Sequence, residues 1–149
     1  MTDLRTLFSQ DEWKLLQFSA LWVFQTVAVA DGKIDEGEVR ALGRELSEAH
    51  LYHNPLASQT LQTLADDFNA IYKLFKTDER GPRDGLAAVA DLVEERMGMD
   101  EARRFKMALL LLGRNIALAE GGGFLGLGER TSEQEKAALV TIASALRTM

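Results

Sequence analysis

Residues 27–42 read VAVADGKIDEGEVRAL, a stretch that holds the end of one helix, an acidic turn and the start of a second helix. Gly32 is a typical C-terminal stop, because glycine adopts left-handed backbone angles at little cost. Asp35 and Glu38 have the spacing of a capping box, in which a cap oxygen accepts an early backbone N–H and the Glu accepts the N–H of the cap residue. The stretch therefore predicts two helices joined by a short turn.

The same pattern returns near the other end of the chain. Residues 116–121 read IALAEG and residues 132–139 read SEQEKAAL, so an apolar helix end, an acid followed by glycine and a capping box recur in that order. The connection is eight residues longer in this second copy. Two similar helix pairs predict a pseudo-twofold arrangement, with the first helix of each pair at the centre.

The rest of the chain also predicts helices. Leu and Ala together number 42, whereas Val and Ile number 11, and this balance favours helices over strands. Apolar residues recur at helical spacing between the stop signals, and Ser9 and Glu12 form one more capping box. The expected helices cover 9–31, 35–53, 58–81, 82–98, 100–120 and 132–146. We expect an all-α fold, a single domain over 1–149 with six to seven helices.

Composition and charge disfavour several classes of function. The net charge of −6 offers no basic excess for nucleic acid. Cysteine is absent, and the two histidines, His50 and His53, are too few for a structural zinc site of four ligands. No Glu lies three residues before either histidine, as a di-iron carboxylate bundle requires, and no catalytic triad is suggested. The sequence therefore predicts a protein that is not an enzyme.

The sequence also predicts a protein that does not span a membrane. The two most apolar stretches, 15–30 and 107–119, are interrupted by polar residues and fall short of the ~20 apolar residues of a membrane-spanning helix. The N-terminus shows no basic flank followed by a cleavage site. We expect a cytoplasmic protein.

The two acidic helix junctions resemble a known family. AVADGKIDEGEVRAL at residues 28–42 and IALAEGG with SEQEKAAL in the second copy are similar to the two helix-pair motifs of the TerB-like tellurite-resistance family. The typical motif of that family is A-x-A-D-G-x-(I/L)-(S/D)-x-x-E. The second copy departs from it, because Glu120 stands for Asp and a glycine-rich stretch over 121–128 is inserted.

The resemblance implies an all-helical protein linked to tellurite resistance and to broader stress responses, without enzymatic activity. Proteins of that family act in membrane-associated complexes with other tellurite-resistance proteins, some of which bind calcium. It thus implies protein partners, a position in the cytoplasm or peripherally at the inner face of the membrane, and a scaffolding role. The alternative function is a generic helical interaction module whose acidic loops only cap helices.

The acidic loops are candidates for a weak divalent-cation site, with calcium as one possible ion. Residues 31–38 fit the second half of an EF-hand loop, but Val27 and Val29 stand where its first ligands would be, so oxygens must come from elsewhere. An acid at the end of a helix is unfavourable unless a cation compensates it. The candidate ligands are Asp31, Asp35, Glu38, Glu120 and Glu135. An ion pair with Lys33 or Arg130, or capping alone, explains the same acids.

The glycine-rich stretch carries three large apolar residues, Phe124, Leu125 and Leu127. It lacks the Gly-Lys-Ser/Thr ending of a phosphate-binding loop. Two interpretations remain: the three side chains cover the core, or they dock on a partner or a lipid surface.

Overall fold

The structure of the chain is a computed structural model that describes residues 3–28, 36–121 and 133–148, without the side chains of 36–38, 119–121, 134 and 135. Within these ranges the chain forms helices and no strands, which confirms the predicted all-α fold. The α-helices are α1 (Gln10–Ala28), α2 (Glu36–Ser47), α3 (Pro55–Asp66), α4 (Phe68–Thr77), α5 (Pro82–Met97), α6 (Met99–Gly121) and α7 (Glu133–Ala145). Two short 3-10 turns are η1 (Leu4–Leu7) and η2 (Ala49–Leu51).

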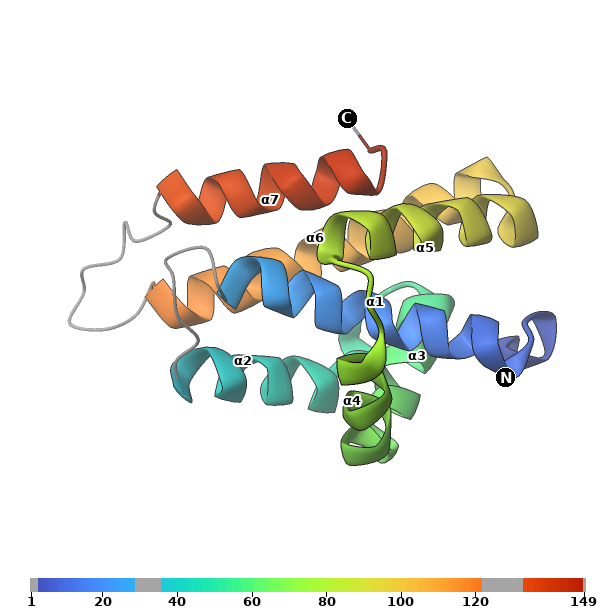
Figure 1. The fold of residues 1–149 in the computed structure, drawn as a ribbon, viewed down its shortest axis with the longest axis horizontal. Coiled ribbons are helices and arrows are strands. Elements are labelled where there is room, and N and C mark those ends of the chain that lie inside the picture. The colour runs from blue at the N-terminus through green and yellow to red at the C-terminus, as the bar shows by residue number, and fades with distance from the viewer. Residues whose placement is uncertain (1–2, 29–35, 122–132, 149) are drawn as a thin grey trace.

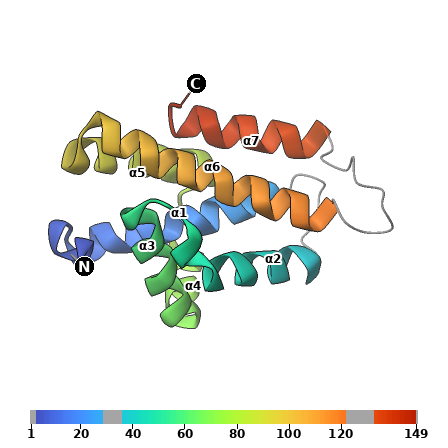
Figure 2. The same cartoon turned by 180° about the vertical axis from the view of Figure 1, so that it is seen from behind.

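Helices α1 and α6 form the centre of the bundle. α2 and α7 lie on opposite sides of this pair (Figures 1 and 2). Each flanking helix packs on the central helix of the other pair: α2 on α6, and α7 on α1 as well as on α5 and α6. This exchange agrees with the predicted pseudo-twofold arrangement of two helix pairs.

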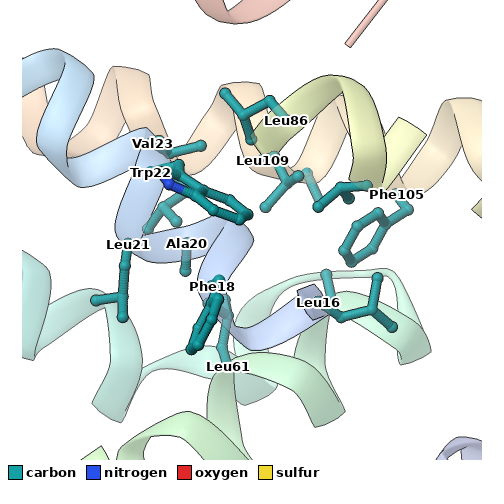
Figure 3. Packing of buried hydrophobic residues seen from close by; sticks show 14 of the residues in the cluster. Leu16, Phe18, Ala20, Leu21, Trp22, Val23, Leu61, Leu86, Phe105 and Leu109 are labelled. Carbon is teal, nitrogen blue, oxygen red and sulfur yellow. The ribbon is translucent and has the colours of Figure 1, made fainter. Parts of the chain in front are cut away.

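The core is built around the aromatic side chains of α1. Trp22 is 1% exposed and packs edge-on against Phe18 and Phe75, at centroid distances of 5.7 Å for each. Leu86 of α5 and Phe105 of α6 are also buried close to this cluster (Figure 3). The core thus joins segments that are far apart in the sequence.

Several helix boundaries follow the local signals. The backbone N–H of Glu12 donates to Ser9 Oγ over 3.1 Å, and the N–H of Ser9 donates to Glu12 Oε1 over 2.7 Å, which confirms the first capping box. α5 starts at Pro82 and ends before Gly98, as predicted.

The prediction of one helix over 58–81 is wrong. The structure divides this region into α3 and α4, because Asp67 leaves helical geometry at φ −134° and ψ 38°. The change of direction lets Phe75 pack against Trp22 and Phe18 of α1. α3 also starts earlier than predicted, because the Asn54 side chain accepts the N–H of Ala57 over 2.8 Å and acts as its cap.

α6 is central, but it is not apolar on all sides. Leu109 and Leu112 are buried, whereas Leu111 is 40% exposed and Arg114 is exposed. The sequence alone does not show which of the four consecutive leucines at 109–112 are buried. Their burial depends on which helices surround α6.

Candidate functional site

The predicted cation ligands lie at or beside the helix junctions. Asp31 and Asp35 are outside the described residues, while Glu38, Glu120 and Glu135 are within helices but their side chains are outside the description. The docking candidates Phe124, Leu125 and Leu127 are also outside the described residues.

What the structure does describe is where the helix ends lie. α1 and α6 end, and α2 and α7 begin, at the same end of the molecule (Figures 1 and 2). The two helix junctions of the repeat therefore start and finish on one side of the bundle.

The two histidines lie elsewhere and are both exposed, His50 within η2 and His53 just after it. Among the side chains that the structure describes, no three His, Asp or Glu residues gather closely enough to hold a metal ion.

An apolar groove of about 310 Å³ lies between α2 and the junction of α3 and α4. We call it the α2–α4 groove; its lining residues are Val39, Leu42, Gly43, Leu46, Ser47, Ala65 and Phe68. Its volume is at the lower end of the range typical of ligand-binding clefts. Most of its lining side chains are apolar.

Two features of the sequence create this groove. Ala65 and Phe68 flank the break at Asp67, so the turn between α3 and α4 leaves the side of α2 uncovered. Gly43 contributes no side chain, and a Cβ placed there would be more than 4 Å from every atom other than its chain neighbours and the backbone of its own helix. The backbone of α2 is therefore accessible to an approaching partner.

Basic side chains of α2 and aromatic side chains of α4 lie near the α2–α4 groove. Arg40 and Arg44 are exposed on α2, and neither forms an ion pair with a described residue. On α4, Phe68 stacks on Tyr72 with 5.7 Å between ring centroids, and Lys76 lies over the Tyr72 ring at 5.2 Å. The groove thus has an apolar lining and an aromatic neighbour on α4, and the two arginines of α2 lie close to it in the sequence.

A buried polar cluster fixes the opposite side of α2. Glu45 is 6% exposed, and its Oε1 accepts the Tyr52 hydroxyl over 2.5 Å and the Asn115 amide of α6 over 2.9 Å. Burial and the bond to Glu45 raise the pKa of Tyr52 far above its usual range, so its hydroxyl remains a donor. The cluster joins α2, the segment after η2 and α6, and it holds the wall of the groove in place.

A second recess, of about 490 Å³, lies beside the start of α1. Two of its side chains form structural bonds: Trp13 Nε1 and Gln17 Nε2 both donate to Thr63 Oγ1, over 3.0 and 3.1 Å. The Ser9–Glu12 capping box also borders it. These contacts are explained by the attachment of α1 to α3.

The comparisons with known proteins place the chain in a family without assigning an activity. No family model matches the chain, and no solved structure matches it. A protein of Methanothermobacter thermautotrophicus, described as "Uncharacterized protein ORF11'", is 30% identical over 125 residues. The match covers 80% of this chain and 82% of that protein. The chain belongs to the same family as ORF11'.

For this member of the ORF11' family, sequence reasoning missed the α2–α4 groove. The spacing of Val39, Leu42 and Leu46 indicates an apolar stripe that a neighbour would cover. In the structure Leu42 and Leu46 are covered, but Val39 is 54% exposed. The signal that could have located the groove was Gly43, a small residue in the middle of an amphipathic helix.

Proposed function

We propose that the protein is a non-enzymatic binding or scaffold module that takes an amphipathic helix of a partner protein in the α2–α4 groove. The observation that carries the proposal is the groove itself, an apolar recess with an exposed Val39 and an open backbone at Gly43. Helix-in-groove binding places an apolar stripe of one helix into such a recess.

The arginines of α2 near the groove specify the partner further. Arg40 and Arg44 are one helical turn apart and exposed on α2, and neither forms an ion pair with a described carboxylate, although Arg44 borders a recess with Glu45 and Glu48. A partner helix with acidic residues beside its apolar stripe would pair with them and be favoured over a basic helix. The proposed occupant is therefore an acidic amphipathic helix.

A peptide experiment tests this function. The probe is a designed helix with leucines at i, i+3, i+4 and i+7 and flanking glutamates, and its binding is followed by fluorescence anisotropy. Val39→Asp places a charge in the groove and should weaken binding about tenfold or more, because an interface charge without a partner is costly. Val140→Asp is the matched control, since Val140 is 51% exposed on α7.

A second probe tests the role of Arg40 and Arg44. A peptide with lysines in place of the glutamates should bind more weakly than the acidic peptide. Equal binding of the acidic peptide to the Val39→Asp and Val140→Asp proteins would contradict the docking site. Equal binding of the two peptides to the unaltered protein would contradict the role of Arg40 and Arg44.

We also propose that the module has a TerB-like, stress-related role, at the cytoplasmic face of a membrane-associated complex. Its support is the motif at residues 28–42 and the common end of the molecule at which the helix junctions start and finish. None of the helices in the described ranges is both long and apolar enough to cross a membrane. In this role the acids Asp31, Asp35, Glu38, Glu120 and Glu135 hold a weakly bound divalent cation such as calcium.

Calorimetry tests the cation site separately from the groove. Calcium is titrated into metal-stripped protein and into the Asp31→Asn, Glu120→Gln double variant. Saturable heat that the double variant loses supports the cation site. The absence of heat with calcium, magnesium and zinc contradicts it and favours the alternative, a helical interaction module whose acidic loops only cap helices.

A further inference from the structure

A pocket of about 190 Å³ opens between the first turns of α6 and the segment that follows α7. We call it the cationic pocket; its lining residues are Met99, Arg103, Lys106, Met107, Arg147 and Thr148. Half of these side chains are cationic, although the chain as a whole has a net charge of −6. The pocket is separate from the α2–α4 groove and from the acidic helix junctions.

Lys106 is the most buried charge of this pocket, at 3% exposure. Its Nζ donates to Glu94 Oε2 of α5, so the buried side chain has a partner of opposite charge. An ammonium group has three N–H donors, and the described residues supply an acceptor for one of them. The remaining N–H donors are available to an acceptor in the pocket.

Arg147 is held in the pocket at a conformational cost. Its φ of 61° is in the left-handed region, where helix ends usually have glycine. The turn is made by the N–H groups of Arg147 and Thr148, which donate to Ser144 O over 3.0 Å and to Ala143 O over 2.9 Å. Glycine would adopt this turn with less strain. We therefore attribute the presence of an arginine at this position to a role of its guanidinium group.

The Arg147 guanidinium is only partly used within the described structure. Its Nη2 donates to Asp91 Oδ1 over 2.6 Å and to Glu94 Oε1 over 3.0 Å. Its Nε and Nη1 donate to no described residue. The two carboxylates therefore orient the guanidinium beside Lys106 and leave donors on its other edge.

Arg103 adds a third positive charge to the pocket. It lies one turn before Lys106 on the same face of α6. It forms no ion pair with a described residue, whereas its neighbour Arg104 pairs with Glu101 over 2.6 Å. Three cations thus meet two carboxylates, Asp91 and Glu94, and one positive charge remains without a counterpart among the described residues.

We propose that the cationic pocket binds the phosphoryl group of a small organic phosphate. Arg103 and Lys106 line the pocket from α6, and Arg147 lines it from the segment after α7. Donors on three separate side chains suit the tetrahedral oxygens of a phosphate better than the planar fork of one carboxylate. Met99 and Met107, 66% and 52% exposed, provide apolar contacts for the organic part of the ligand.

Amide chemical shifts measured by NMR test the proposal on the full chain. Inorganic phosphate and phenyl phosphate are the probes, and sodium chloride at equal ionic strength is the reference. Both phosphates should shift the amides of Arg103, Lys106, Met107 and Thr148 to saturation, and chloride should not. Phenyl phosphate should bind more tightly than inorganic phosphate, because it also contacts the methionines.

Two variants connect the binding to the pocket. Arg103→Ala should weaken phosphate binding about tenfold, because it removes a charge-assisted hydrogen bond. Arg104→Ala, which removes an equal charge one residue away, should leave the affinity unchanged. Arg147→Gly should also weaken binding, because it removes the guanidinium while glycine keeps the left-handed turn. An unfolding midpoint equal to that of the unaltered protein would show that the fold of this variant is intact.

Three results would overturn the proposal. The first is a set of shifts that grow without saturation, or that chloride reproduces. The second is an equal loss of affinity in the Arg103→Ala and Arg104→Ala proteins. The third, binding of phenyl phosphate no tighter than of inorganic phosphate, would overturn the organic phosphate as ligand.

Discussion

Gly85 of α5 lies directly against the indole ring of Trp22 of α1. A Cβ placed at position 85 would be 2.5 Å from both Cδ2 and Cζ2 of Trp22. Real Cβ atoms do not approach other atoms so closely, so the contact between the two helices depends on the absence of a side chain. Because Trp22 is 1% exposed, its ring has little room to move away.

Gly85→Ala should therefore destabilise the fold, although alanine favours helices. We expect a loss of ~1–3 kcal/mol in the free energy of unfolding, the usual cost of overpacking a core. Urea unfolding followed by Trp fluorescence measures it. Gly43→Ala, in open space on α2, is the control and should stabilise by ~0.5–1 kcal/mol through helix propensity. A stabilising effect of both changes would contradict the close contact with Trp22.

Ser9→Ala should weaken the start of α1. It removes the oxygen that accepts the N–H of Glu12, and loss of an N-cap costs ~1 kcal/mol. For a chain of this size such a loss lowers the melting temperature by about 2–4 °C. Ser47→Ala is the control, because the Ser47 hydroxyl only donates to Arg44 O on an exposed surface. Equal changes in melting temperature for the two variants would argue against the capping box as a stabilising contact.

Tyr52→Phe should destabilise the attachment of α2 to the bundle. The change removes the hydroxyl that donates to the buried Glu45 carboxylate, and a buried polar group left with fewer partners costs ~1–3 kcal/mol. Tyr72→Phe is the matched control, since Tyr72 is 40% exposed. The free energies of unfolding of the two variants in urea provide the comparison, and a Tyr52→Phe protein as stable as the Tyr72→Phe protein would sink the prediction.

Stability should fall in acid, partly through Glu94. The Lys106 ammonium, and then the Arg147 guanidinium, hold the pKa of this carboxyl below its ordinary value of 4.5. Its folded pKa is thus lower than its unfolded pKa, so its stabilisation is present above the unfolded pKa and is lost as the pH falls through the folded pKa.

Urea unfolding at a series of pH values tests this dependence. The fall in unfolding free energy below pH 4.5 should be shallower in Glu94→Gln, which should also be less stable at neutral pH because Lys106 loses its partner. Glu95→Gln removes a neighbouring charge whose side chain is 75% exposed and serves as the control. Acid dependence reduced to the same extent in both variants would show that Glu94 is not its source.

The sequence predicted the features that arise from neighbouring residues. Ser9 with Glu12 starts α1, and Pro82 with Gly98 bounds α5, because a cap or a stop acts within one helical turn. The break at Asp67 was not predicted, since the apolar spacing runs through it without interruption. The α2–α4 groove was missed for the same reason, because it exists only where α4 turns away from α3.

By itself, the sequence determined that the chain is helical and that two similar helix pairs, with acidic junctions, stand at its ends. Capping residues and helical periodicity carry this information, and both act over a few residues. Only the tertiary structure decided which side of each helix is covered. Arg103, Lys106 and Arg147 line one pocket although Lys106 and Arg147 are 41 positions apart in the sequence, because the packing of α5, α6 and α7 brings them together. Contacts between residues so far apart leave no periodic pattern in a single sequence.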